Sequence, residues 1–188
     1  MLRLSYRSML RLARRGQWVI VLVTGVAGSG KSTVGALAAT RLGWRFVDAD
    51  DYHSHANIEK MRAGRALTEA DRRPWLERLA ALVTDARSHG TSLVLACSAL
   101  RRAYRDVLVG GRRDDVLLVY LWGDPALLEA RMAAREHFMP AAGLPAQLAT
   151  LEPPEADERP LILTAEESPQ RLADSIVRAA RGGEAQDA

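Results

Sequence analysis

The chain has 188 residues, of which 48% are hydrophobic and 26% are charged, values that are ordinary for one soluble globular domain. Its single cysteine, Cys97, excludes an internal disulfide and is typical of a reducing compartment. No apolar run approaches the roughly 18 residues that would span a membrane. We therefore expect a cytoplasmic protein with no membrane segment.

The net charge of +3 comes from the N-terminal end of the chain. Residues 1–15 hold five arginines and no acid, and the remainder is slightly acidic. We expect residues 1–17 to be a disordered basic extension. Its composition resembles a transit peptide, but no cleavage site is legible and Met9 offers a later start. Nucleic-acid binding is not expected, because Tyr6 is the only aromatic residue between these arginines.

A phosphate-loop motif follows the first predicted strand, residues 18–24. Residues 25–32 read G-x-x-x-x-G-K-S before a helical pattern at 31–42, which is the context in which this motif binds a nucleoside triphosphate. Loop amides converge on the β-phosphate, Lys31 reaches the β- and γ-phosphates, and Ser32 offers a hydroxyl to Mg²⁺. The alternative is a glycine turn that matches by chance. The expected nucleotide-binding residues are Gly25, Val26, Ala27, Gly28, Ser29, Gly30, Lys31, Ser32 and Thr33.

Strand and helix patterns alternate along the rest of the chain. After the phosphate loop we expect strands at 45–47, 92–96, 116–122 and 161–163, and helices at 56–62, 75–88, 99–109, 124–135 and from 168 onward. Thr68 and Asp71 have the spacing of a capping box. Residues 136–160 hold five prolines and little pattern, so we expect a lid loop there. The domain should span 18–181, with a frayed tail at 182–188.

This alternation predicts an α/β, three-layer fold in which a five-stranded parallel sheet has helices on both faces. Ligands of such sheets bind outside the carboxyl ends of the strands. Asp48 and Asp50 end the second strand, and Ser98 ends the third. We expect Asp50 to orient the acceptor hydroxyl, Asp48 to order the metal's water shell, and Ser98 either to contact substrate or to cap the next helix. Both aspartates also suit a solvated turn.

Seven motifs in order resemble the gluconate kinases of the P-loop kinase group. They are GVAGSGKST at 25–33, DADDYH at 48–53, ANIEKM at 56–61, LTEADRRPWL at 67–76, CSALRRAYRD at 97–106, REHFMP at 135–140 and LATLEPP at 148–154. The resemblance covers roughly residues 18–180. It implies a P-loop kinase-like fold and transfer of the ATP γ-phosphate to the 6-hydroxyl of D-gluconate, with ATP and Mg²⁺ as cofactors.

Gluconate is a polyhydroxy acid, so its site needs hydrogen-bonding groups and a cation for the carboxylate. The expected substrate-binding residues are Asp50, His53, Arg73, Ser98, Tyr104, Arg105 and His137, and Arg101 and Arg102 come from the same segment. For each arginine, a solvated position on a helix face is an equal alternative. Which arginine binds the carboxylate therefore stays open.

Arg131 and Arg135 lie four residues apart on the helix that enters the lid, which suits them to hold the migrating phosphate. The sequence departs from the family here, since Arg135-Glu136 runs directly into His137 without the usual glycine. Two other functions stay open: another small-molecule kinase of this fold, such as a shikimate kinase, or a non-catalytic nucleotide sensor. A homodimer is also possible.

Overall fold

The computed structural model describes residues 20–134 and 143–182. Five parallel strands form one sheet in the order β2-β3-β1-β4-β5. They are β1 (Ile20–Thr24), β2 (Arg45–Asp48), β3 (Leu93–Ala96), β4 (Val116–Trp122) and β5 (Leu161–Thr164). Every residue of β1 is buried, because Leu22 is paired with Leu95 on one side and with Leu118 on the other. This confirms the predicted parallel sheet and puts the strand before the phosphate loop at its centre.

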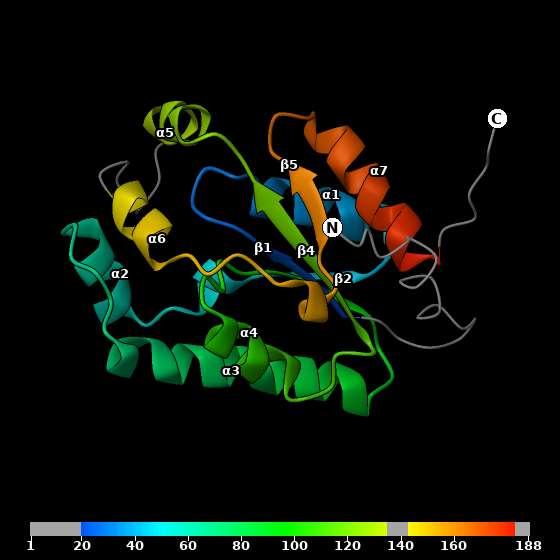
Figure 1. The fold of residues 1–188 in the computed structure, drawn as a ribbon. Coiled ribbons are helices and arrows are strands. Elements are labelled where there is room, and N and C mark those ends of the chain that lie inside the picture. Colours follow the sequence, from blue (N-terminus) through cyan, green and yellow to red (C-terminus); the bar gives the residue numbers. More distant parts are fainter. Residues whose placement is uncertain (1–19, 135–142, 183–188) are drawn as a thin grey trace.

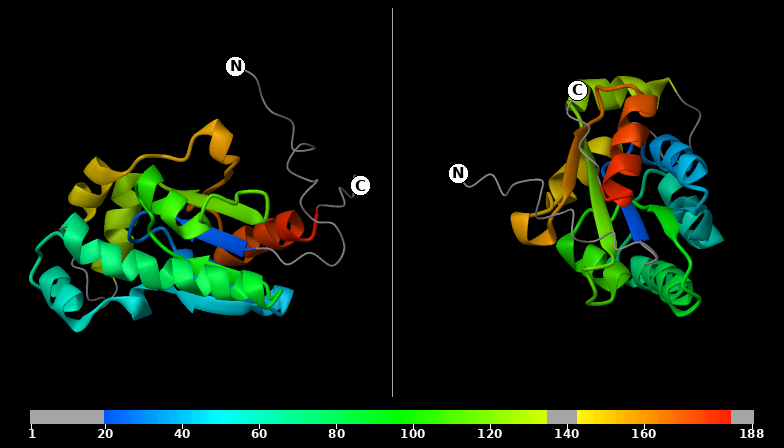
Figure 2. Two further views of the ribbon diagram at one scale, coloured as in Figure 1. Left: turned by 90° about the horizontal axis from the view of Figure 1, so that it is seen from below. Right: turned by 90° about the vertical axis from the view of Figure 1, so that its right-hand side faces the viewer.

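Helices cover both faces of the sheet (Figures 1 and 2). Alternate residues of each strand point to opposite faces, so β1 contributes to two separate cores. Val21 and Val23 pack with α1 (Lys31–Leu42) and α7 (Pro169–Ala180), whereas Ile20 and Leu22 pack with α3 (Glu69–Ser88) and α4 (Arg102–Val109). The three layers predicted from the sequence are therefore present.

Three shorter helices, α2 (His55–Arg62), α5 (Pro125–Ala133) and α6 (Leu144–Thr150), gather at the end of the sheet toward which the strands point (Figure 1). The segment before α2 is a 3-10 turn over Ala49–Tyr52, which begins where Asp48 accepts a hydrogen bond from the backbone N–H of Asp50. The carboxyl ends of the strands are thus surrounded by short helices that carry the predicted functional motifs.

Several predicted element boundaries were wrong, for local reasons. The Thr68–Asp71 capping box starts α3 at Glu69, so this helix begins before Pro74 and not after it. Helix α4 begins only at Arg102, because Ala99 has a positive φ of 38° that breaks the helical pattern. Residues 143–160 are not a structureless loop: they contain α6, which is too short for a legible periodicity, and a 3-10 turn over Ala156–Glu158.

The predicted basic extension and most of the tail lie outside the described residues. Within residues 20–134 and 143–182, no helix combines the length and apolarity needed to cross a membrane.

Candidate active site

The phosphate loop leaves β1 and turns directly into α1. Gly28 in this turn has a φ of +79°, and a Cβ atom there would lie 2.7 Å from the carbonyl oxygen of Leu128 in α5. Only glycine fits such a close approach without moving backbone. Gly30 also has a positive φ, at the residue before α1 begins. The loop therefore presents its amides at a helix N-terminus, as expected for a phosphate cradle.

Lys31 lies within the curve of this loop. Its Nζ donates a hydrogen bond of 2.9 Å to the carbonyl oxygen of Val26. Burial lowers the pKa of Lys31, while the nearby negative charges of Asp50 and Asp48 act in the opposite direction. The Nζ of Lys31 thus binds a loop carbonyl and lies close enough to Asp48 and Asp50 to be affected by their charge.

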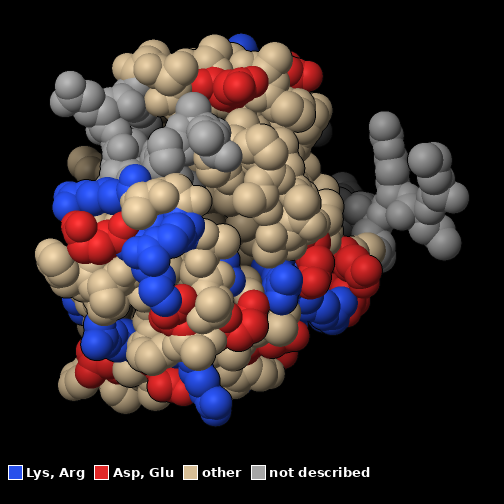
Figure 3. All heavy atoms as spheres, turned by 90° about the vertical axis from the view of Figure 1, so that its left-hand side faces the viewer, with Lys and Arg blue, Asp and Glu red and all other residues tan. Residues whose placement is uncertain are grey.

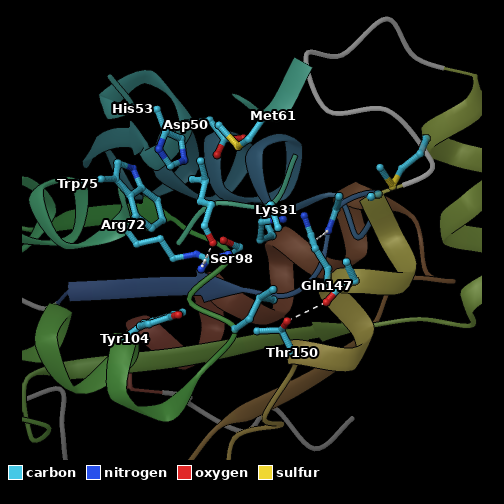
Figure 4. Close-up of a pocket in the computed structure, with 18 of the residues that line it drawn as sticks. Lys31, Asp50, His53, Met61, Arg72, Trp75, Ser98, Tyr104, Gln147 and Thr150 are labelled. Carbon is cyan, nitrogen blue, oxygen red and sulfur yellow. Dashed lines mark hydrogen bonds between the residues drawn. The ribbon is translucent and has the colours of Figure 1, made fainter. Parts of the chain in front are cut away.

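A cavity of about 250 Å³ opens beside Lys31. The phosphate loop, the loop after β3, the α2–α3 segment and α6 form its walls (Figure 4). Ten of the predicted site residues line it: Ala27, Gly28, Gly30, Lys31, Ser32, Asp50, His53, Ser98, Tyr104 and Arg131. Gly25, Val26, Ser29 and Thr33 belong to the loop or to the first turn of α1 without being among the lining residues. Asp48 is not among the lining residues either; it caps the 3-10 turn that carries Asp50.

His53 and Trp75 form a stacked pair on one side of the cavity, opposite Gln147 and Thr150 (Figure 4). Their ring centroids are 4.3 Å apart and the planes differ by 13°. The indole Nε1 of Trp75 donates a 2.7 Å hydrogen bond to the carbonyl oxygen of Ala49, next to Asp50. Burial, and secondarily Arg72, lowers the pKa of His53 to about 4, so the imidazole is neutral at pH 7. Its Nδ1 is buried and has no hydrogen-bond partner among the described residues.

Arg72 is a lining residue that the sequence reasoning missed. It lies three residues before Trp75, on the same face of α3, and its Nη1 donates to the carbonyl oxygen of Leu67 at 2.6 Å. Its guanidinium lies 5.8 Å from the ring centroid of Tyr104. The predicted Arg73 points away from the cavity: it is exposed and pairs with Glu77. Helical spacing from Trp75 would have selected Arg72.

Gln147 is the second residue that sequence reasoning missed. From α6, its Oε1 accepts a 2.8 Å hydrogen bond from the backbone N–H of Ala27 in the phosphate loop. This hydrogen bond joins α6 directly to the phosphate loop. No motif signalled this contact, because it joins two segments that are far apart in the sequence.

The face that carries α5 at its top holds basic side chains in its lower half, interspersed with acidic ones (Figure 3). Helix α2 carries cations that are paired: Lys60 contacts Asp71, and Arg62 contacts Glu59. Arg65 and Arg131 also line the cavity. The cations that line the cavity suit anionic ligands.

Comparison with known proteins identifies the family. A family model described as an AAA domain matches residues 20–154. A probable gluconokinase of Mus musculus is 41% identical, over 85% of this chain and 96% of the mouse protein. A gluconokinase of Gluconobacter oxydans is 43% identical, over 84% of this chain and 89% of its own. The chain belongs to the gluconokinase family. It is therefore a P-loop kinase.

Solved structures agree with this assignment. The crystal structure of a gluconokinase from Sinorhizobium meliloti 1021 matches with a TM-score of 0.72 and 38% identity, over 90% of this chain and 93% of that one. The family's sequence motifs therefore occur here on the family's fold.

The prediction that Arg105 binds the substrate of this gluconokinase-family chain was wrong. Arg105 is buried behind the wall of the cavity, where its guanidinium binds Glu158 through Nε and Nη2. Arg102 is likewise held by Asp157, and Arg101 by Glu69. These arginines sit on α4 or just before it, and the acids that face them come from segments far along the chain, so the sequence could not reveal the pairing.

The structure describes residues 143–160 of the predicted lid. Arg135 and His137 lie outside the described residues, as does the position of the missing glycine. Arg131 lines the cavity from α5, next to Met132. Residues 152–158 are not part of a free lid, because Glu152 and Glu158 are bonded to α4 and to the loop before it.

Proposed function

We propose that this chain transfers the γ-phosphate of ATP to the 6-hydroxyl of D-gluconate and releases 6-phospho-D-gluconate. The observation that carries the proposal is a single cavity lined both by the phosphate loop and by Asp50, His53 and Arg72. Relatives that share about 40% of its residues are named gluconokinases, which supports gluconate as the acceptor.

Different lining residues suit the nucleotide and the acceptor. Loop amides and Lys31 would hold the β- and γ-phosphates, and Arg131 would approach the migrating phosphoryl group from α5. Asp50 would accept the proton of the attacking hydroxyl, because it is the one carboxylate among the described residues that line the cavity. Neutral His53 can hydrogen-bond sugar hydroxyls, and Arg72 offers the carboxylate a cation.

Mg²⁺ fits the oxygen donors at the nucleotide end. Among the described residues, no cluster of three or more His, Cys, Asp or Glu side chains could enclose a metal ion. Mg²⁺ in kinase sites is held largely by phosphate oxygens and water, to which Ser32 and Asp48 would contribute here. When bound, Mg²⁺ would neutralise charge on the phosphates.

A coupled assay of ADP release tests the proposal against a panel of gluconate, shikimate and related sugar acids. We expect gluconate to stimulate release strongly in the presence of Mg²⁺. Stimulation by shikimate instead would indicate a different kinase of the same fold. ATP binding with no response to any acceptor would indicate a nucleotide sensor.

Substitution of the proposed base gives a sharper test. Asp50→Asn should lower kcat by about 10²- to 10⁴-fold, the usual effect of losing a positioned base, with little change in ATP affinity. Asp51→Asn is the matched control, because Asp51 lies in the same 3-10 turn but is exposed. Near-normal turnover of Asp50→Asn would remove Asp50 from the mechanism.

A further inference from the structure

A buried ion pair lies directly behind the cavity wall. Arg105 of α4 and Glu158 of the 3-10 turn have side chains that are 1% and 0% exposed. Two parallel hydrogen bonds of 2.7 Å join them, from Nε to Oε2 and from Nη2 to Oε1. Burial acts to raise the pKa of Glu158, but the hydrogen bonds from Arg105 and from the N–H of Glu155 bring it below its ordinary value. The pair is thus charged at neutral pH.

The remaining nitrogen of Arg105 connects this pair to two more segments. Its Nη1 donates to the carbonyl oxygens of Ala99 at 3.1 Å, Leu100 at 3.4 Å and Glu152 at 3.0 Å. Ala99 is one of two described residues other than glycine with a positive φ, so its strained backbone needs such support. One guanidinium therefore joins the loop after β3, the segment after α6 and the 3-10 turn.

The loop after β3 and the segment after α6, which accept hydrogen bonds from Arg105, both adjoin residues that line the cavity. Ser98 and Leu100 line the cavity from the loop after β3, and Gln147 and Thr150 line it from α6. The two segments also bond to each other, since the N–H of Glu152 donates to the carbonyl oxygen of Leu100 at 2.8 Å. The position of α6 matters for the nucleotide, because Gln147 contacts the phosphate-loop N–H of Ala27.

We propose that Arg105 and Glu158 are positioning residues for phosphoryl transfer: they fix α6 and the Ser98 loop at the spacing that the two substrates require. Neither side chain touches the cavity, so they act through Ser98 and Gln147. A buried ion pair contributes little to stability compared with apolar side chains of the same volume. An apolar pair, however, could not bind the three carbonyl oxygens that join the two walls.

The chain contains a matched pair that lacks this connection. Arg87 and Asp115 have side chains that are 9% and 3% exposed and are joined by hydrogen bonds of 3.0 and 2.7 Å. Arg87 also donates to the carbonyl oxygens of Val109 and Arg112. Asp115 directly precedes β4, at the amino ends of the strands and away from the cavity. Like Arg105 and Glu158, this is a buried ion pair whose arginine also binds backbone carbonyls. The residues that it contacts do not line the cavity.

The test compares Glu158→Gln and Arg105→Lys with Asp115→Asn and Arg87→Lys. All four variants weaken a buried pair, so all should lower Tm. We expect only the first two to change function, with kcat reduced or KM raised by about 10- to 100-fold, the effect of misplacing reacting groups by about 1 Å. The control variants should keep both constants close to wild type. Because the assay uses gluconate, this part rests on the proposed function.

Titration calorimetry with ATP and Mg²⁺ needs no acceptor and separates the two proposals. We expect weaker nucleotide binding in Glu158→Gln and Arg105→Lys than in the two controls, whichever acceptor the enzyme uses. Unchanged ATP affinity together with unchanged kcat and KM, in folded protein, would overturn the positioning role. Equal losses in the Arg87–Asp115 controls would also overturn it, because they would indicate general destabilisation. If Glu158→Gln does not fold, Arg105→Lys, which keeps the charge, decides the question.

Discussion

Replacing Trp75 with phenylalanine separates the two functions of its indole ring. The stacking surface for His53 is largely retained, but the Nε1–H that donates to the carbonyl oxygen of Ala49 at 2.7 Å is lost. Both residues are buried, at 4% and 0% exposure, so water cannot readily replace the donor. The missing hydrogen bond and the smaller ring should together cost about 1–3 kcal/mol of unfolding free energy. For a domain of this size that lowers Tm by about 2–12 °C.

This loss should also affect catalysis, because Ala49 is the residue before Asp50. A less constrained 3-10 turn lets the carboxylate move, so kcat should fall while the KM for ATP changes little. Thermal unfolding and the coupled assay measure the two effects. Trp122→Phe is the matched control: the same chemical change at a side chain that is 45% exposed. If Trp75→Phe lowers Tm and kcat no more than Trp122→Phe does, the reasoning about the Ala49 contact is wrong.

Two further predictions concern the loop and the histidine. Gly28→Ala should abolish detectable ATP binding in calorimetry and lower Tm, because the new Cβ would meet the carbonyl oxygen of Leu128 at 2.7 Å in a backbone conformation of positive φ; unchanged affinity would contradict the proposed cradle. The pKa of His53 falls from an ordinary 6.5 to about 4 in the folded protein. Its contribution to stability is therefore complete above pH 6.5 and is lost as the pH falls toward 4. His53→Gln should show a shallower decline of Tm across that range, and an unaltered decline would refute the assigned pKa.

The sequence predicted those parts of the fold that depend on local pattern. The β-branched run before the phosphate loop and the serine before α7 each determine an element through neighbouring residues, and both elements were found where expected. The predicted capping box at Thr68 is also present, but it starts α3 earlier than the expected residue 75. Helix α6 was missed because its seven residues span barely two turns, and its stability comes from packing of Leu144 into a distant cluster. The spacing of apolar residues along the sequence does not reveal such a contact.

The same distinction applies to the candidate site. Lys31, Asp50 and His53 were predicted from motifs in which residue type and spacing carry the chemistry. Arg73 and Arg105 were assigned because they are cations in the right segments, but a cation's role depends on which acid faces it. Glu77 faces Arg73 from the next turn, and Glu158 faces Arg105 from another part of the chain. Only the folded structure distinguishes a cation that faces the ligand from one that is already neutralised.

The central place of β1 in the sheet has a consequence for how the protein is made. Ile20 pairs with Leu93 and with Val116, so the first of the described strands acquires its neighbours only after the chain has been synthesised beyond residue 116. Contacts of such large sequence separation form late and slow the folding of a domain. The phosphate loop at the end of β1 therefore reaches its final surroundings only after Leu128, which its Gly28 approaches closely, has been synthesised. Nucleotide that binds there stabilises only completed molecules, and ATP in the cell would draw the nascent chain toward its native state.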